Sequence, residues 1–209
     1  MQTIDWYFDF VSPFAYLASQ RLDRIEGEVV IVPKPVLFAG FLNRWETKGP
    51  AEIPEMRRYT FRHISWLAQR NDIPLTLPPA HPFNPLKLLR LATACDASMH
   101  VVDRLFRFVW QEGKSSDDPE AWHELTASLE LAEADALVST PAVKQQLIDQ
   151  TQRAIEKGIF GVPSFVIDEH IFWGFDAIDF INDYLADQQY FDRPNMQAVD
   201  AMPVGVARR

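Results

Sequence analysis

The sequence predicts an α/β fold in which a large, all-helical insertion interrupts a small sheet domain. Two observations support this prediction. A strand–helix–strand pattern opens the chain over residues 4–32, and a β-hairpin followed by a helix closes it over residues 164–185. Between these blocks lies a long stretch of amphipathic segments separated by prolines. We therefore expect one sheet that is built from both ends of the sequence.

The opening block is expected to form a βαβ unit. Residues 4–11 are rich in aromatic and β-branched side chains and are too few for a free-standing helix, so they predict a buried strand. Ser12 and Pro13 then begin a helix, because serine is a favoured N-cap residue and proline fits the first helical position. Residues 29–32 form the next strand. Two strands joined by one helix usually pair in parallel.

The helical block extends from residue 41 to residue 157. Clear helical periods cover residues 59–70 and 86–108, and loops that contain proline separate the helices. Asp118 before Pro119 predicts a further helix start, because an acidic N-cap and a proline at the first helical position both favour one. We expect these helices to form a domain of their own.

The closing block contains two strands, at residues 164–167 and 170–173, joined by a tight turn. A last helix is expected to begin after Gly174-Phe175-Asp176. A βαβ unit, a helical insertion, and then a hairpin and a helix form the arrangement of a thioredoxin-like fold. We therefore expect a discontinuous thioredoxin-like domain at residues 1–40 and 158–188, with a helical insertion domain at residues 41–157 between its two parts. Residues 189–209 would form a tail that is mobile or packed on a partner.

Composition narrows the classes of function. The chain has 20 lysine and arginine residues against 29 aspartate and glutamate residues, a formal net charge of −9 at pH 7, which disfavours nucleic acid and anionic membranes as partners. Its one cysteine, Cys95, excludes an internal disulfide and a Cys-x-x-Cys pair, and it fits a reducing cytoplasm. With no signal-peptide pattern and no long apolar run, we expect a cytoplasmic protein without a membrane anchor.

Ser12 is the first candidate for chemistry. It stands at a helix N-terminus, where unpaired N–H groups and the helix dipole favour an anion, although a simple N-cap is the alternative. A Ser–His–Asp triad is disfavoured because no Gly-x-Ser-x-Gly elbow surrounds Ser12. The five histidines lack the spacing of metal ligands, so we expect no metal site.

Three other positions allow two interpretations each. Pro163, directly before a strand, is either an ordinary edge-strand proline or the cis-proline of thioredoxin-like proteins, which faces the first helix and exposes the backbone of Val162 to a peptide-like ligand. Asp176 either caps the last helix or receives the ammonium group of a ligand. Lys48 is either a solvated loop charge or a group that binds an anion.

Five motifs occur in a fixed order, at residues 8–17 (FDFVSPFAYL), 84–90 (NPLKLLR), 109–113 (VWQEG), 160–165 (FGVPSF) and 172–176 (FWGFD). Through them, from about residue 3 to residue 185, the chain resembles the family of 2-hydroxychromene-2-carboxylate isomerase and kappa-class glutathione transferase, a branch of the DsbA-like thioredoxin superfamily. The resemblance implies a glutathione-dependent enzyme, normally a homodimer, in which the serine at the position of Ser12 replaces a redox cysteine.

The resemblance also implies a role for each glutathione-binding position. Ser12 would stabilise the glutathione thiolate, because a helix N-terminus lowers the pKa of a thiol. The backbone of Val162, before Pro163, would pair with the cysteinyl moiety, and Asp176 would hold the glutamyl ammonium group. The remaining expected contacts are Thr47, Lys48 and Phe175.

This sequence departs from the family at several of these contacts. Thr47 and Phe175 replace an asparagine and a small polar residue, while His63 and Ala177 stand where an aspartate and an arginine are usual. These differences permit a ligand other than glutathione.

The implied reaction is a cis-trans isomerisation in aromatic-compound degradation. The thiolate adds to the conjugated enone of a 2-hydroxychromene-2-carboxylate, the former double bond rotates, and elimination gives trans-o-hydroxybenzylidenepyruvate. The substrate, a small aromatic carboxylate, needs a polar receptor beside an aromatic pocket. The candidates for this receptor are Phe14, Trp45, Lys48, Phe83 and Asn84.

Two other functions remain open. A kappa-class-like glutathione transferase with a broader range of electrophiles would share Ser12, and a non-catalytic thioredoxin-like binding protein would keep only the peptide-binding proline. A dithiol oxidoreductase is disfavoured, because Ser12-Pro13-Phe14-Ala15 occupies the place of a Cys-x-x-Cys pair.

Overall fold

The structure is a computed structural model that describes residues 1–206, and its centre is a four-stranded sheet with the order β2-β1-β3-β4. β1 (Gln2–Phe8) pairs in parallel with β2 (Val29–Pro35) and antiparallel with β3 (Ser164–Ile167). β3 forms an antiparallel hairpin with β4 (His170–Trp173). Two strands from each end of the sequence share this sheet, so the expected α/β fold class and the parallel βαβ opening are confirmed.

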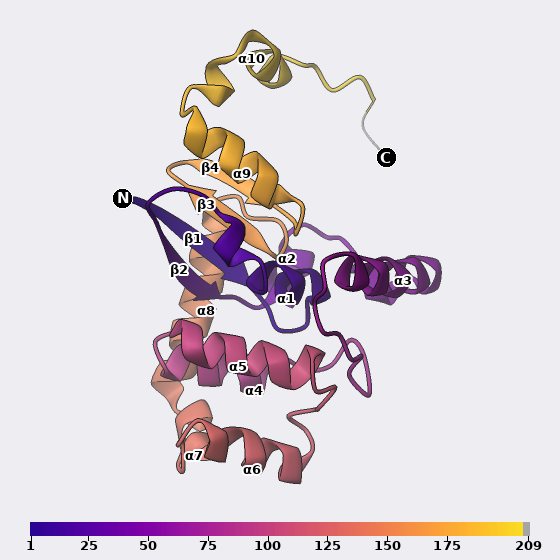
Figure 1. The fold of residues 1–209 in the computed structure, drawn as a ribbon, viewed down its shortest axis with the longest axis vertical. Helices are drawn as coiled ribbons and strands as arrows, with labels where there is room; N and C mark the ends of the chain where they lie inside the picture. The colour runs from indigo at the N-terminus through magenta and orange to yellow at the C-terminus, as the bar shows by residue number, and fades with distance from the viewer. Residues whose placement is uncertain (207–209) are drawn as a thin grey trace.

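Helices surround the sheet and extend beyond it (Figure 1). α1 (Pro13–Ser19) and the short 3-10 helix η1 (Leu22–Arg24) connect β1 to β2, and α9 (Ala177–Ala186) follows the hairpin. The helices between β2 and β3 are α2 (Phe38–Arg44), η2 (Pro50–Glu52), α3 (Pro54–Arg70), α4 (Leu86–Ala94), α5 (Met99–Trp110), α6 (Pro119–Ser128), α7 (Ala134–Ser139) and α8 (Pro141–Glu156). Over residues 1–206, none of the helices has the length and apolar character needed to cross a bilayer.

Two predicted helix starts have the expected caps. The Ser12 hydroxyl accepts a hydrogen bond from the amide of Ala15, with Pro13 at the start of α1. The Asp118 carboxylate accepts hydrogen bonds from the amides of Glu120 and Ala121. Pro119 is the first residue of α6. Local sequence chemistry is enough to fix both positions.

The helical period over residues 86–108 is two helices rather than one. α4 ends at Ala94, and the chain turns through Asp96 and Ala97, whose φ angles of 51° and 50° lie in the left-handed region. The amide of Ala97 donates to the carbonyl of Ala92, which closes the end of α4. Apolar spacing does not reveal this turn because both helices bury an apolar face against the same core.

The segment after residue 188 contains regular structure up to Asp200. It holds η3 (Tyr190–Asp192) and α10 (Pro194–Asp200), so α9 is not the last helix. The ring of Phe191 packs against His170 and Phe172 of β4, with centroids 4.1 and 5.9 Å away. The first part of the expected tail therefore covers the sheet edge, and residues 207–209 lie outside the described residues.

Fully buried aromatic rings join the sheet to the helical insertion. Phe106 of α5 contacts Trp6 and Phe8 of β1, as well as Phe10 just beyond this strand. The centroid distances lie between 4.7 and 5.9 Å. The indole N–H of Trp110, also on α5, donates to the carbonyl of Phe10 over 2.8 Å. The insertion is thus attached to the segment that leads from β1 into α1.

Truncation of the central ring should cost much of the stability. Phe106→Ala removes the contacts of this ring with four others, those of Trp6, Phe8, Phe10 and Tyr16, and leaves a cavity. We therefore expect a loss of about 3–5 kcal/mol in the free energy of unfolding. Urea unfolding measures this change in the free energy of unfolding. Ile148→Ala, at a side chain that is 59% exposed on α8, is the control and should change the free energy by no more than about 0.5 kcal/mol. Equal losses for the two variants would contradict this description of the core.

Candidate active site

Ser12 and Val162, separated by 150 positions, meet at the N-terminus of α1. The Ser12 hydroxyl donates to the carbonyl oxygen of Val162 over 3.3 Å. The Val162–Pro163 peptide bond is cis, which agrees with the second of the two interpretations of Pro163. Val162 is 8% exposed, and its amide donates no hydrogen bond within the described residues. A buried N–H without a partner is uncommon, so this backbone is suited to a peptide-like ligand.

The loop before Ser12 is held by a buried carboxylate. Asp9 is fully buried, and its two carboxylate oxygens accept hydrogen bonds from the amides of Val11 and Phe38, at 3.0 and 2.8 Å. Burial raises the pKa of Asp9 to about 7, although both hydrogen bonds favour the ionised form. Sequence reasoning missed Asp9, whose one visible signal is a single acid between aromatic residues at the end of a buried strand.

Asp176 stands at the N-cap position of α9, but its carboxylate makes no capping hydrogen bond. Its side chain is exposed and makes no hydrogen bond with another described residue, so the capping interpretation is wrong for this structure. The amide of Gly174 donates to the carbonyl of Pro163 over 3.0 Å, which ties the start of α9 to the cis-proline. Gly174 has a φ of +108°, and a Cβ there would lie 2.5 Å from the carboxylate of Asp176. Phe175 is half-buried against the core.

The loop that follows α2 carries three predicted site residues. Trp45 is 41% exposed, and its indole N–H donates to the carbonyl of Ile159 over 3.3 Å, near the cis-proline segment. Thr47 and Lys48 are exposed, and Lys48 forms no ion pair within the described residues. Trp45 is thereby linked to the segment before Pro163, whereas no contact links Lys48 to Ser12.

Two predicted substrate residues have partners other than Ser12. Phe14 lies in the first turn of α1, and its ring centroid is 6.0 Å from that of His63 on α3. The side-chain oxygen of Asn84 accepts from the amide of Leu86 over 3.1 Å and so supports the start of α4. Phe83 is half-buried, with its ring 6.2 Å from that of His81.

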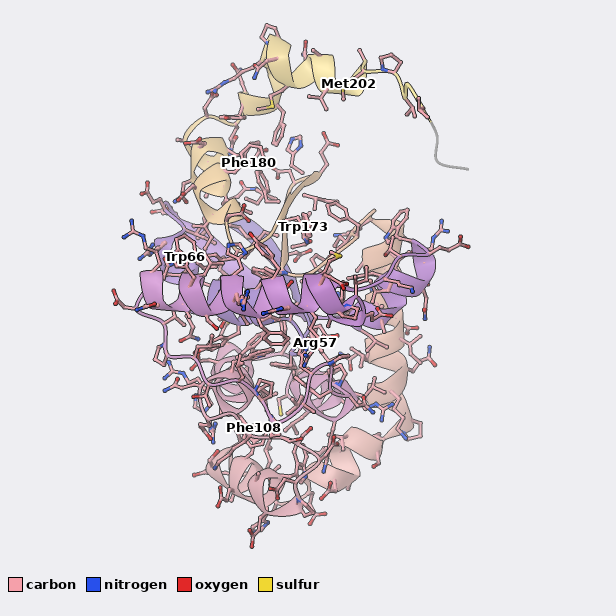
Figure 2. The ribbon with its side chains drawn as sticks, turned by 90° about the vertical axis from the view of Figure 1, so that its right-hand side faces the viewer. Arg57, Trp66, Phe108, Trp173, Phe180 and Met202 are labelled. Carbon is pink, nitrogen blue, oxygen red and sulfur yellow. The ribbon has the colours of Figure 1, made fainter. Side chains whose placement is uncertain are left out.

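His81 is a second residue that sequence reasoning missed. Its Nε2–H donates to the carbonyl of Val11 over 2.8 Å, directly before Ser12, so neutral His81 carries its proton on Nε2. Burial lowers the pKa of His81, and its Nδ1 is buried without a partner among the described residues. Beside it lies a groove lined by three arginines of α3, the helix that crosses the side of the molecule seen in Figure 2.

Metal ligation receives no support from the side chains. Over residues 1–206, no three histidine, cysteine or acidic side chains gather closely enough to hold a metal ion. Cys95 is half-buried at the end of α4, and burial raises the pKa of its thiol, which disfavours a reactive thiolate there.

The chain is similar in sequence to known proteins along most of its length. A family model described as a DsbA-like thioredoxin domain matches residues 3–186. A 2-hydroxychromene-2-carboxylate isomerase of Sphingobium xenophagum is 30% identical over 203 residues, which cover 89% of this chain and 99% of that protein. Glutathione S-transferase kappa 1 of Rattus norvegicus is 24% identical over 182 residues, covering 79% of this chain and 80% of that protein.

The solved structures extend the likeness to the fold. The structure of a 2-hydroxychromene-2-carboxylate isomerase superposes with a TM-score of 0.80 at 23% identity, and the match covers 96% of this chain and all of that one. The arrangement of sheet and helical insertion is therefore shared along nearly the whole chain.

Asp9 should make the protein less stable as the pH rises from about 4 to about 7. The folded protein keeps this proton up to about pH 7, whereas the unfolded chain loses it near pH 4. Within this window the unfolded state binds fewer protons, so the free energy of unfolding falls, by at most roughly 1.4 kcal/mol per pH unit.

Urea unfolding of wild type and Asp9→Asn at several pH values measures this contribution. The stability of wild type relative to the variant should decline between pH 4 and 7 and level off above. A difference that stays constant over this range would contradict a protonated, buried carboxyl group.

Proposed function

The chain belongs to the DsbA-like thioredoxin family, in the branch that contains the 2-hydroxychromene-2-carboxylate isomerases, and from this premise we propose that it is a glutathione-dependent isomerase of 2-hydroxychromene-2-carboxylate-type substrates. The observation that carries the proposal is the Ser12 hydroxyl at the start of α1, 3.3 Å from the carbonyl that precedes the cis-proline. We call this arrangement of Ser12, Val162 and Pro163 the thiol corner. It has no cysteine of its own, which favours a reaction that uses the thiol of a bound ligand.

The residues present fit a glutathione molecule. The amide of Val162 lacks an internal partner and is available to a peptide backbone, and the exposed carboxylate of Asp176 is available to an ammonium group. Gly174 connects these two positions through its bond to Pro163. When bound, glutathione supplies the thiolate that adds to the enone and leaves again after rotation.

Ser12 acts on the thiol in two ways in this proposal. Its oxygen is oriented by the bond from the amide of Ala15, so its proton is directed either to the Val162 carbonyl or to a sulfur placed beside it. The N-terminus of α1 adds the positive end of the helix dipole, and both effects lower the pKa of a thiol. Ser12 thus stabilises the nucleophile and is not itself the nucleophile.

An aromatic wall stands next to this corner. Trp173 and Phe160 are 57% and 47% exposed, and their rings meet edge to face at 5.2 Å. Gly161 makes room for this arrangement, since a Cβ there would lie 2.5 Å from the indole nitrogen of Trp173. A flat aromatic substrate is suited to such a surface.

A glutathione transferase of broader electrophile range is the second candidate, favoured by the similarity to the kappa-class enzyme along most of the chain. It would use the same Ser12 and Asp176. Turnover of a chlorodinitrobenzene-type electrophile without isomerisation of the chromene carboxylate would favour it over the isomerase.

Glutathione should stabilise the folded protein through Asp176. A ligand present at about 100 times its dissociation constant adds roughly 2.7 kcal/mol to the free energy of unfolding, so the thermal midpoint should rise. Asp176→Asn should lose most of this rise. Asp179→Asn, at an exposed acid in the first turn of the same helix, should keep it. An unshifted wild-type midpoint at millimolar glutathione would contradict the proposal.

Removal of the Ser12 hydroxyl should impair turnover more than binding. We expect Ser12→Ala to lower kcat by roughly 10²–10³-fold with little change in the KM for the chromene carboxylate, because the lost hydrogen bond serves the thiolate. Ser19→Ala, at the other end of α1, is the control. Steady-state isomerase kinetics at saturating glutathione make the measurement, and equal kcat values for wild type and Ser12→Ala would refute the role of Ser12.

A further inference from the structure

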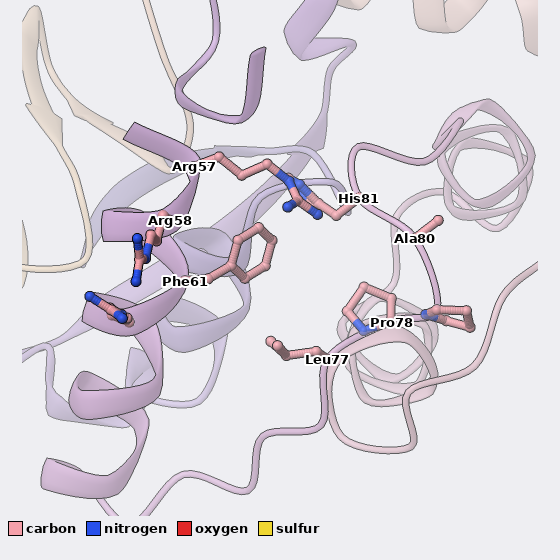
Figure 3. A pocket seen from close by; sticks show the side chains of 9 residues that line it. Arg57, Arg58, Phe61, Leu77, Pro78, Ala80 and His81 are labelled. Carbon is pink, nitrogen blue, oxygen red and sulfur yellow. The ribbon is translucent and has the colours of Figure 1, made fainter. Parts of the chain in front are cut away.

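A cationic groove lies between α3 and the segment that precedes α4. It has a volume of about 510 Å³ and is lined by Arg57, Arg58, Phe61, Arg62, Leu77, Pro78, Pro79, Ala80 and His81. Figure 3 shows Arg57 reaching from α3 toward His81 across the groove, with Phe61 pointing between the helix and Leu77. Arg57 and the apolar walls therefore face the same space.

The charge of this groove is not balanced within the protein. No carboxylate lines it, and none of Arg57, Arg58 and Arg62 forms an ion pair with another described residue. The guanidinium of Arg57 lies over an aromatic ring, 5.2 Å from the centroid of Phe61. In a chain of net charge −9, three arginines left together without acids mark a site for an external anion.

The walls of the groove indicate the chemistry of the uncharged part of the ligand. Phe61, Pro78 and Pro79 present flat apolar surfaces, and Leu77 is 47% exposed. Burial lowers the pKa of His81, which is therefore neutral at pH 7 and leaves the positive charge to the arginines. An apolar or aromatic body with one carboxylate matches such a site better than an inorganic anion does.

The groove adjoins the Ser12 loop. The ring of His81 stands edge to face against Phe61 at 5.0 Å, and its Nε2–H donates to the carbonyl of Val11 over 2.8 Å. Phe14, on the first turn of α1, faces α3 from the other side. A ligand held in the groove therefore lies next to the residue that precedes Ser12.

We propose that this groove binds the carboxylate of an aromatic acid, with Arg57 as the main receptor and Arg58 and Arg62 as supporting cations at its rim. For a chromene carboxylate this assignment rests on the proposed function, and it gives the substrate-binding charge to α3 instead of to Lys48. Arginine is the suited residue because its planar fork binds both carboxylate oxygens.

Chromone-2-carboxylate, a stable bicyclic acid, tests the groove without glutathione or turnover. Calorimetric titration should show binding to wild type and at least about tenfold weaker binding to Arg57→Gln, with Arg57→Lys between them. The matched control is Arg70→Gln, at an exposed arginine on the last turn of α3 that does not line the groove. Uncharged chromone should bind all four proteins equally, because it lacks the group that Arg57 receives.

Two results of the titration would overturn the groove assignment. One is the absence of chromone-2-carboxylate binding to wild type, and the other is an affinity that Arg57→Gln and Arg57→Lys leave unchanged. If chromone-2-carboxylate binding depends on Arg57 but the protein does not bind glutathione, the groove assignment stands and the proposed isomerase function is refuted. Glutathione-dependent isomerisation with an unchanged KM in Arg57→Gln would sustain the isomerase and refute the groove.

Discussion

The four-residue loop between β1 and α1 is the constraint on which the site depends. The buried carboxylate of Asp9 binds the amides of Val11 and Phe38, so the loop is closed by its own side chain and joined to the start of α2. Trp110 donates to the carbonyl of Phe10, and His81 donates to that of Val11. Three distant segments between β2 and β3 thus fix the position from which Ser12 begins α1.

This arrangement explains why a helical insertion of this size accompanies a small sheet. α5 supplies Trp110 as an anchor and Phe106 as the centre of the aromatic core, while α3 and the segment before α4 supply the groove beside the loop. The sheet brings in Val162 and Pro163 through the pairing of β3 with β1. The insertion therefore contributes to the proposed site as well as to stability. The corner that we propose to hold a thiol and the cationic groove both adjoin this loop.

Sequence reasoning was sufficient where the controlling chemistry is local or carried by ordered motifs. The Ser12 and Asp118 caps, the hairpin of β3 and β4, and the parallel βαβ opening follow from side chains a few positions apart. The turn at Asp96 and Ala97 escaped it, because left-handed φ angles at these residues have no signature in apolar spacing. Asp9 and His81 escaped it for a different reason, since their partners lie 29 and 70 positions away. Lys48 was a candidate for the substrate cation because a charged loop residue can bind an anion, whereas the arginines of α3 come together at a groove only when the chain folds.

The central claim is that Ser12 and the N-terminus of α1 hold a borrowed thiol as a thiolate. The most direct test is a pH titration of glutathione bound to the protein, followed by the ultraviolet absorbance of the thiolate, in wild type and in Ser12→Ala. The account predicts a thiol pKa at least about one unit below the ordinary value near 8.5 in wild type. It also predicts a return toward that value in Ser12→Ala. A bound thiol that titrates like the free one in wild type would contradict the claim.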